Sequence, residues 1–433
     1  MTMYELITKK KHGEELSSDE IKYLVKGFTD GSIPDYQMSA FCMAVIFKGM
    51  NDRETADLTL AMAESGDMVD LSLFGDLSCD KHSSGGVGDK TTLIVAPIVA
   101  SLGGVVAKMS GRGLGHTGGT VDKLESIPGY KTELTPEEFM SISQKCGLCV
   151  CGQSGNLAPC DKKLYALRDV TATVDSIPLI VSSIMSKKIA AGSKNIMLDV
   201  KCGSGAFMKT KEDAKKLAEG MVEIGKRCGR NTKALITNMD VPLGFAVGNS
   251  LEVIEAINVL KGKITGDIRD VSVALSAGLV ASLKGILADE ARLLCENAID
   301  NGSAFEKFKE WISYQGGNSD FADNTDLFPK AEFEHVIKSP KEGYISHMDA
   351  EKIGLASCEL GAGRKTKTDE IDLSAGLVLS KKTGNFVHKD EEIAKLYTCK
   401  KELIERAEKI FLSALEFSDT KPEKQALIIE RVD

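Results

Sequence analysis

The sequence predicts a multidomain α/β protein, in which a small all-helical domain accompanies a larger mixed-sheet α/β domain and a C-terminal α+β module. Three observations lead to this prediction. The chain has 433 residues, too many for one core, because single hydrophobic cores stop growing near roughly 250–300 residues. Its first residues show helical periodicity alone, whereas from about Leu71 short apolar runs that end in glycine loops alternate with helical stretches. Beyond about Gly343 the pattern changes again, to glycine-rich turns with alternating Thr and Val.

Residues 1–66 are expected to form several short helices, and residues 161–192 are expected to return to the same helical domain. Ser17 and Glu20 have the spacing of a capping box, and the apolar residues after them recur at helical spacing. Residues 161–192 lack the alternation that is typical of strands. Further helix-start signals stand at Pro34, Asn51 and Ser176-Ile177-Pro178. The helical domain is therefore predicted to be discontinuous in sequence.

The α/β domain is predicted to comprise residues 71–160 and 193–342. Val105-Val106-Ala107 and Ile196-Met197-Leu198 are apolar runs followed by loops with glycine and serine, as buried strands of such a fold are. Helical stretches come between the strand-like segments, at 212–225 and 251–260. Strand, loop and helix thus repeat, which is typical of a layered α/β domain.

Residues 343–433 are predicted to form the C-terminal module and to pack on the α/β domain. A turn over residues 382–385, with the sequence Lys-Thr-Gly-Asn, precedes the apolar pair Phe386 and Val387. A tail helix from about Lys401 is expected to end the module.

Charge and hydropathy exclude several classes of function. The net charge is −9 and the pI is near 5.4, so the surface as a whole repels polyanions and offers no general basic face to nucleic acid or anionic lipid. No apolar stretch approaches the roughly 18 residues of a membrane span, and no apolar segment of a secretory signal follows the first lysines. We therefore expect a cytoplasmic protein that acts on small-molecule substrates and has neither nucleic acid nor membrane as a partner.

The eleven cysteines are scattered and odd in number, which suits a reducing compartment. One cluster stands out, with Cys146, Cys149, Cys151 and Cys160. A zinc or redox site is one interpretation of its Cys-x-x-Cys spacing, but no second such pair and no nearby histidine pair completes a tetrahedral site. Small buried thiols in a strand around Val150 are the preferred interpretation.

Two glycine-rich loops carry the densest chemistry of the chain. The first follows Lys81, His82 and Ser83, and the second runs from Lys108 to Thr120. Glycines let backbone N–H groups converge on an oxyanion, while hydroxyl groups donate further hydrogen bonds and lysine supplies positive charge. Two loops that follow neighbouring strands open into one crevice at the strand ends. The pair therefore predicts a phosphate site, although either loop alone would equally suit plain turns.

Two other nucleotide-binding motifs are matched only in part. Residues 85–91 resemble a Walker loop, but Asp89 replaces the glycine that precedes Lys90, so the motif for a nucleoside triphosphate is broken. Residues 113–118 match the glycines of a dinucleotide fingerprint, yet the acidic residues that follow stand at a helix start after Thr135-Pro136 rather than at a strand end. We expect no organic cofactor.

The second loop provides the most specific link to a known family. Residues 110–125, Ser-Gly-Arg-Gly-Leu-Gly-His-Thr-Gly-Gly-Thr-Val-Asp-Lys-Leu-Glu, resemble the full signature of the thymidine and pyrimidine-nucleoside phosphorylases. The resemblance includes residues 81–83, 165–171 and 182–188 and spans essentially the whole chain. It implies a homodimeric pentosyltransferase, with a cleft between its domains, that splits uridine, thymidine and deoxyuridine reversibly. Inorganic phosphate is the implied co-substrate, and the products are the free base and (2-deoxy)ribose 1-phosphate.

The resemblance also implies a set of site residues. Phosphate is expected at Lys81, Ser83, Thr92, Lys108, Ser110 and Thr120. The pyrimidine is expected at Arg168, Ser183 and Lys187. A monovalent cation, potassium, is implied at Gly88, position 90, Leu243, Ala246 and Glu255. Lys90 departs from the relatives, which carry a hydroxyl residue there, and its ammonium would repel a cation unless only the backbone carbonyl of Lys90 faces the site.

Lys108 bears on the choice of sugar. Thymidine-restricted members resemble one another in having Met at this position, whereas Lys suits the broader enzymes that accept ribose and 2-deoxyribose. The favoured hypothesis is therefore a broad pyrimidine-nucleoside phosphorylase, with a thymidine-restricted enzyme as the alternative.

These residues suit phosphorolysis without a general base, since phosphate is already an anion. Arg168 and Lys187 are the predicted catalytic cations, because they can stabilise the charge that the departing pyrimidine takes up. His82 is the third catalytic candidate, bonding or protonating the ring oxygen nearest the glycosidic bond, with loop orientation as its alternative role; His116 is expected to shape its loop. Ser183 and Lys187 are four apart and so share one helix face. Domain closure is expected to join the two half-sites and exclude water.

Two rival functions stay open. A phosphoribosyltransferase of the anthranilate type resembles this family in fold, but it needs carboxylates for magnesium, and no acidic pair adjoins the loops. A catalytically silent nucleoside sensor is the second rival, although such a protein should have lost some of these polar residues.

Overall fold

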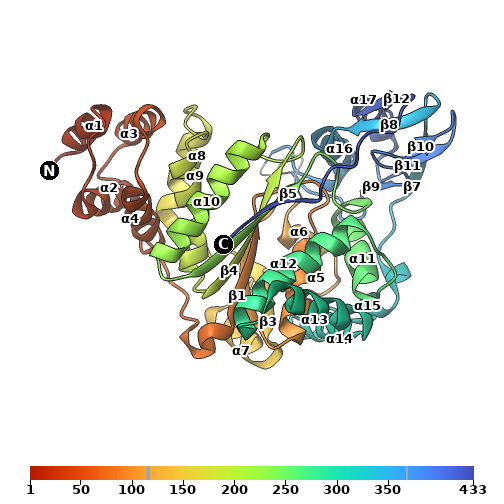
Figure 1. Cartoon of the computed structure of the whole chain (residues 1–433), viewed down its shortest axis with the longest axis horizontal. Helices are drawn as coiled ribbons and strands as arrows, with labels where there is room; N and C mark the ends of the chain where they lie inside the picture. The colour runs from red at the N-terminus through yellow and green to blue at the C-terminus, as the bar shows by residue number, and fades with distance from the viewer. Residues whose placement is uncertain (114–117, 367–368) are drawn as a thin grey trace.

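A computed structural model describes residues 1–113, 118–366 and 369–433 (Figure 1). A six-stranded sheet in the order β13-β5-β4-β1-β2-β3 forms the centre of the molecule. Neighbours among β1 to β5 run parallel, and β13 joins the β5 edge in the antiparallel direction. The strands are β1 (Ser78–Ser83), β2 (Val105–Ser110), β3 (Leu148–Gly152), β4 (Asn195–Cys202), β5 (Asn231–Asn238) and β13 (Ile428–Val432).

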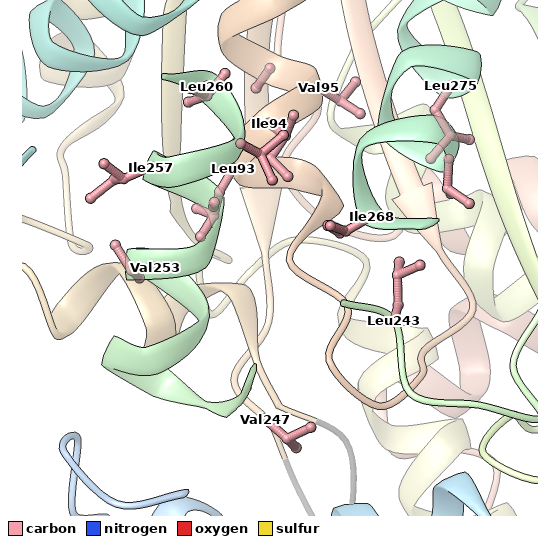
Figure 2. Close-up of a cluster of buried hydrophobic side chains, with 14 of the residues drawn as sticks. Leu93, Ile94, Val95, Leu243, Val247, Val253, Ile257, Leu260, Ile268 and Leu275 are labelled. Atoms are coloured by element: carbon pink, nitrogen blue, oxygen red, sulfur yellow. The ribbon is translucent and has the colours of Figure 1, made fainter. Parts of the chain in front are cut away.

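The sheet lies between helices on both faces. Strand β4 is buried along its whole length, as a parallel strand covered on both sides must be. Helix α5 is buried from Thr91 to Ala100, and Figure 2 shows its Leu93 and Ile94 in one cluster with apolar side chains of α11 and α12. The helices of this part are α5 (Thr91–Ser101), α6 (Thr120–Glu125), α7 (Pro136–Cys146), α10 (Lys211–Arg227), α11 (Asn249–Leu260), α12 (Asp267–Lys284), α13 (Ala288–Asp300), α14 (Ser303–Tyr314) and α15 (Asp320–Asp323).

A group of helices forms one end of the molecule (Figure 1). It contains α1 (Met3–Lys11), α2 (Ser18–Asp30), α3 (Asp35–Lys48), α4 (Asp52–Ala63), α8 (Pro159–Asp169) and α9 (Ile177–Ala190). Cys160 and Leu164 of α8 and Leu179 of α9 are buried in the same core as the first four helices. Helix α9 also places Val181 and Met185 in the core under the sheet. The two segments of helical sequence therefore share a core, and α9 contributes to the sheet core as well.

The helix starts predicted from the sequence are present. Ser17 and Asn51 each complete a capping box, and Pro34 stands directly before α3. Thr135 caps α7 in the same way. Ser176 precedes α9 as expected, but its side chain makes no capping hydrogen bond. Capping boxes thus mark three of these five helix starts, and a proline at or near the first turn marks the other two.

The C-terminal part contains two small sheets, in the orders β6-β9-β11-β7 and β10-β8-β12. Their elements are β6 (Ala246–Gly248), β7 (Phe333–Lys338), β8 (Gly343–Met348), α16 (Ala350–Ser357), β9 (Gly376–Leu379), β10 (Phe386–Val387), β11 (Glu392–Thr398), α17 (Ile404–Ser413) and β12 (Leu415–Ser418). The turn predicted over residues 382–385 is present, with the Lys382 N–H donating to the side-chain oxygen of Asn385 at 2.8 Å.

Two details of this part differ from the sequence prediction. Strands β7 and β6 lie outside residues 343–433, yet they pair into the same sheet as β9 and β11. The expected tail helix, α17, is followed by β12 and β13, and β13 leaves the module for the central sheet. By pairing with β5, β13 satisfies hydrogen-bonding groups of a sheet edge that would otherwise be open, a long-range gain that local sequence does not reveal.

We call the group of α1 to α4, α8 and α9 the helical end. The segments that connect it to the central sheet are joined to one another by backbone hydrogen bonds. The Asp67 N–H donates to the Asn156 carbonyl at 3.0 Å, and the Val69 N–H donates to the Ala190 carbonyl at 2.8 Å. Gly192 has a φ of +89°, and a Cβ there would lie 2.3 Å from the Val69 carbonyl oxygen. Only glycine fits this approach. We call these connecting segments, at residues 67–70, 156 and 190–192, the hinge.

The cysteines behave as the preferred interpretation expected. Cys149 and Cys151 are buried in β3 beside Val150, and Cys146 and Cys160 are buried in helices. Burial raises the pKa of Cys146 to about 11 and that of Cys151 to about 12, so these thiols stay protonated at neutral pH. Within the described ranges, no single helix has the length and apolarity of a membrane span; α12 and α13 reach them only as a pair bent by 116°.

Candidate active site

The carboxyl ends of β1 and β2 hold a small polar cavity of about 200 Å³. Strand β1 brings Lys81 and Ser83 to its wall, and β2 brings Lys108 and Ser110. Thr92 comes from the start of α5 and Thr120 from the start of α6. The cavity is also lined by His82, Gln153, Lys187 and Lys188. All six residues predicted to hold phosphate therefore surround one space, at the strand ends where open parallel sheets bind ligands.

Lys81 lies at the centre of a buried polar network and is only 3% exposed. Its ammonium donates to the hydroxyl of Thr91, the neighbour of Thr92. The carboxylates of Asp89 and Asp199 lie 3.6 Å and 3.7 Å from the same nitrogen. These carboxylates offset the cost of burying the charge, and they fix the ammonium beside the cavity.

Asp80 joins two more lysines below the cavity. Its carboxylate accepts from Lys108 at 3.1 Å and from Lys188 of α9 at 2.7 Å. Burial alone would raise the pKa of Asp80, but the two ammonium groups lower this pKa to about 2. Lys108 also donates to the Lys81 carbonyl at 2.6 Å. Asp80 thus ties β2 and the helical end to β1.

Lys108 is a candidate phosphate ligand whose pKa is lowered toward neutral pH. It is 3% exposed, and this burial, together with the ammonium groups of Lys188 and Lys81, lowers its pKa to about 8 although Asp80 acts in the opposite direction. An anion in the cavity would restore the preference for the charged form. Lys108 can therefore report on phosphate binding in the range of pH in which enzymes are assayed.

His82 is held neutral by its surroundings. Burial and the nearby ammonium groups of Lys188 and Lys108 hold its pKa well below the ordinary value, although Asp80 acts in the opposite direction. A neutral imidazole can donate one hydrogen bond and accept another. The lowered pKa thus favours a hydrogen-bonding role for His82 over proton donation by an imidazolium.

Residues 112 and 113 of the second glycine loop are held by ion pairs and a hydrogen bond. Arg112 makes a two-pronged ion pair with Glu125, at 2.5 Å and 2.7 Å. Asp122 accepts from the Gly113 N–H at 2.7 Å and pairs with Arg364 of the C-terminal part at 2.9 Å. The guanidinium of Arg112 therefore stabilises the loop. Residues 114–117, and with them His116, lie outside the described residues.

Lys187 is the pyrimidine candidate that reaches the cavity. Its ammonium donates to Asp161 of α8 and, at 3.2 Å, to the hydroxyl of Ser183. Ser183 and Lys187 thus share one face of α9, as their spacing predicted. The other oxygen of the Asp161 carboxylate is buried without a hydrogen-bond partner among the described residues. Asp161 holds the Lys187 ammonium beside Ser183 and next to the phosphate residues.

Arg168 stands apart from the cavity. It is 1% exposed, and its guanidinium donates to three backbone carbonyls, those of Thr173 at 3.0 Å, Val174 at 2.7 Å and Leu179 at 3.0 Å. Neither Arg168 nor Ser183 is among the described residues that line the small cavity. In this structure Arg168 therefore holds the loop between α8 and α9.

A larger hollow of about 820 Å³ adjoins the small cavity. The two share residues 109–112 and Gln153, and the larger one extends to residues 67–70 of the hinge and to the start of α7. Its size suits a nucleoside better than the small cavity does. The two hollows together provide adjoining spaces for an anion and for an organic molecule.

The residues implied for potassium are brought together, but they do not fit that ion. The side chain of Lys90, and not its carbonyl, points into the site and is fully buried. Its ammonium donates to the carbonyls of Leu243 at 3.0 Å and Ala246 at 2.9 Å and to Glu255 at 2.5 Å. The Gly88 carbonyl accepts from the backbone N–H of Lys90. Potassium at these oxygens would meet the ammonium directly, so the potassium expectation is corrected.

Sequence reasoning missed several residues that the structure adds to the site. Asp80, Lys188 and Asp161 position the predicted lysines, and Gln153 lines both hollows. Asp80 directly precedes Lys81 in the sequence, which was a usable signal. The carboxylate of Asp161 carried no such signal, because its partner lies 26 residues away.

Comparisons with known proteins agree along the chain. The glycosyl transferase family a/b domain matches residues 76–305, the helical bundle domain of the same family matches residues 4–66, and the pyrimidine nucleoside phosphorylase C-terminal domain matches residues 344–418. The pyrimidine-nucleoside phosphorylase of Bacillus subtilis (strain 168) is 53% identical over 412 residues, covering 95% of each chain. That of Geobacillus stearothermophilus is 50% identical over 433 residues, covering 100% of each chain.

A solved structure supports the fold alone. The crystal structure of anthranilate phosphoribosyltransferase from Thermus thermophilus aligns with a TM-score of 0.58 at 17% identity, covering 71% of this chain and 98% of that chain. About seven tenths of the chain thus has an architecture that also occurs in a protein of low sequence identity.

Proposed function

Because this chain belongs to the glycosyl transferase family that includes the pyrimidine-nucleoside phosphorylases, we propose that it splits the glycosidic bond of pyrimidine nucleosides with inorganic phosphate. The observation that carries the proposal is the convergence of Lys81, Ser83, Thr92, Lys108, Ser110 and Thr120 with Lys187 on one cavity. Hydroxyl groups, glycine N–H groups and ammonium groups suit a phosphate dianion. Lys187, from the helical end, supplies a cation on a different side of the same space.

The proposed reaction needs little from the protein beyond position and charge. A phosphate oxygen attacks C1′ of the sugar while the bond from C1′ to N1 of the base breaks, and the electron pair of that bond passes to the pyrimidine. The ammonium of Lys187 stabilises this charge as it develops, which is worth more in the transition state than in the bound substrate. The neutral imidazole of His82 donates a hydrogen bond to the pyrimidine carbonyl oxygen that lies nearest the glycosidic bond. Asp161 keeps Lys187 oriented before the substrate arrives.

Arg168 enters this proposal through motion of the helical end. The residue is 1% exposed and its guanidinium is held by three backbone carbonyls, so the loop between α8 and α9 would have to move before an N–H of Arg168 could reach a pyrimidine oxygen. Movement of that loop within the helical end is the proposed cause, because a rotation about the hinge alone would move Arg168 and its three carbonyl partners together. Rotation about the hinge would in addition close the cavity, since such closure can assemble a site and exclude water. Exclusion of water matters because hydrolysis would release free sugar in place of the sugar phosphate.

Broad sugar specificity is part of the proposal, with uridine, thymidine and deoxyuridine as substrates. Lys108 supports it, because it lines the cavity and its ammonium, which donates to Asp80 and to the Lys81 carbonyl, has a third N–H for a sugar hydroxyl. A thymidine-restricted enzyme is the alternative. Parallel assays with uridine and thymidine distinguish the two, because cleavage of thymidine alone would exclude the broad form.

The proposed assembly is a cytoplasmic homodimer formed through the helical end. Large apolar side chains are exposed there, namely Tyr4 (75% exposed), Tyr36 (74%) and Phe47 (77%), and such exposure suits a contact with a second copy of the chain. Sedimentation of the wild type and of Phe47→Glu tests this assignment. A monomeric wild type would exclude it.

One assay tests the proposed activity against its rivals. The protein is incubated with uridine, and free uracil is measured with and without phosphate. Uracil that forms only with phosphate supports the phosphorylase. In a parallel incubation with uridine 5′-monophosphate, uracil that forms only with diphosphate and magnesium would favour a phosphoribosyltransferase, because these enzymes act on a 5-phosphorylated ribose. The absence of uracil under all conditions would favour a silent sensor.

A further inference from the structure

The ammonium of Lys90 lies in a cage of oxygen atoms. Lys90 directly precedes α5, and its side chain is fully buried. Its three acceptors are two carbonyls, of Leu243 and Ala246, and the carboxylate of Glu255, at distances of 2.5–3.0 Å. An ammonium has three donors, so each donor finds an acceptor in the cage.

The cage is held in shape by contacts that do not involve Lys90. The Glu255 carboxylate accepts from the N–H groups of Phe245 at 2.7 Å and Ala246 at 2.9 Å. The Leu243 N–H donates to the Val87 carbonyl at 3.0 Å, and a Cβ on Gly88 would lie 2.4 Å from the Leu243 carbonyl oxygen. Carbonyls and one carboxylate, fixed in this way, make a binding site for a single positive charge.

The cage also lies beside the phosphate residues. Lys90 is followed by Thr91, which accepts from Lys81, and by Thr92, which lines the small cavity. On the other side, residues 243–247 continue into α11, and Figure 2 shows Leu243 and Val247 near the apolar cluster of α5, α11 and α12. The charge in the cage thus joins the start of α5 to the loop before α11.

We infer that Lys90 is a built-in monovalent cation: its ammonium performs in this chain the structural role that a bound potassium ion would perform in the same cage. Potassium is then unnecessary, and the wild-type chain leaves no place for it. Without the Lys90 ammonium, Glu255 would keep only the more distant ammonium of Lys382 as a counter-charge among the described residues, and a buried carboxylate that loses its direct ion pair is costly. Removal of the ammonium therefore turns the cage into a site that an added cation must fill.

The test compares three proteins, namely the wild type, Lys90→Thr and Lys90→Met. Threonine shortens the side chain and opens the cage, whereas methionine removes the charge but keeps most of the volume. Each protein is purified in KCl and exchanged into KCl or tetramethylammonium chloride of equal ionic strength. The thermal midpoint is measured by calorimetry, and phosphorolysis of uridine is measured in parallel.

The wild type should have the same thermal midpoint and the same turnover in both salts. Lys90→Thr should unfold at a lower temperature and lose roughly tenfold or more in turnover in tetramethylammonium chloride, and added K⁺ should restore both in a saturable way. Lys90→Met should stay impaired in both salts, since its side chain blocks the cage. Should Lys90→Thr unfold on removal of K⁺, refolding on titration with K⁺ gives the same answer.

The thermal measurement does not depend on the proposed activity, whereas the turnover measurement rests on it. A thermal midpoint that depends on K⁺ in Lys90→Thr, without detectable uridine cleavage by the wild type, would therefore uphold the cation role and remove the phosphorylase. A wild type stabilised by K⁺ but not by tetramethylammonium, or a Lys90→Thr protein indifferent to K⁺, would overturn the inference.

Discussion

The affinity of the free protein for phosphate should depend on pH through Lys108. The pKa of this lysine is lowered to about 8 by burial and by its lysine neighbours. The charged form binds the dianion, and the charge is lost as the pH rises through that value, so phosphate affinity should fall with rising pH. By the ordinary titration relation, the protonated fraction decreases from about nine tenths at pH 7 to about one tenth at pH 9.

This change in the protonated fraction of Lys108 sets the expected change in the dissociation constant for phosphate. Because phosphate in the cavity keeps Lys108 protonated, the dissociation constant should rise about tenfold between pH 7 and pH 9, which corresponds to about 1.4 kcal/mol of binding free energy. Titration calorimetry with phosphate alone measures it, with the concentration expressed as dianion so that the titration of phosphate itself is removed. Lys108→Met should bind weakly and with little dependence on pH over the same range.

A matched control comes from Lys209, an exposed lysine paired with Glu351 on the surface. Lys209→Met should keep the tenfold decline. The reasoning is refuted if wild-type affinity is flat between pH 7 and pH 9, or if Lys108→Met retains the full decline.

Four further variants probe other parts of the site. Lys187→Ala should reduce turnover of uridine by about 10²-fold or more, since it removes the cation proposed for the leaving base; near-normal turnover would exclude that role. Asp161→Asn should reduce kcat about tenfold with little change in the thermal midpoint, because it positions Lys187, and an unchanged kcat would remove it from the site. His82→Asn should slow turnover, while the wild-type profile of kcat/KM, with phosphate expressed as dianion, shows no inflection near pH 6.5, since the pKa of His82 lies well below that value; a rise of activity through protonation near pH 6.5 would contradict the neutral imidazole. Gly192→Ala should lower the free energy of unfolding by about 1–3 kcal/mol in urea denaturation, because its φ is positive and its Cβ would meet Val69, and a neutral effect would show that the hinge backbone relaxes.

Local features of the fold could be predicted because their causes are local. A capping box needs only four consecutive residues, so the starts of α2, α4 and α7 are visible at Ser17, Asn51 and Thr135. The end of β2 is similarly marked by polar residues after an apolar run. The pairing of β13 with β5 joins residues nearly 200 positions apart, and no pattern within either strand specifies that partner.

The same difference between local and long-range causes applies to the site. The two glycine loops follow adjacent strands, so one shared phosphate crevice could be predicted from parallel-sheet geometry, whereas the six individual phosphate residues came from the family resemblance. The direction of the Lys90 side chain could not be predicted, because it depends on oxygens of residues 243–255, which reach it only in the folded chain. Arg168 illustrates the converse. An arginine side chain can donate to a pyrimidine oxygen, but the actual partners of Arg168 are backbone carbonyls between residues 173 and 179.

The shared core of the helical end has a consequence for biosynthesis. Helices α1 to α4 pack against Cys160, Leu164 and Leu179, which the ribosome adds about a hundred residues after α4 has been made. Until then the nascent helices must keep apolar surface uncovered, while the first strands of the sheet emerge behind them. The amino-terminal helices are therefore the segment for which a chaperone would be most useful during synthesis.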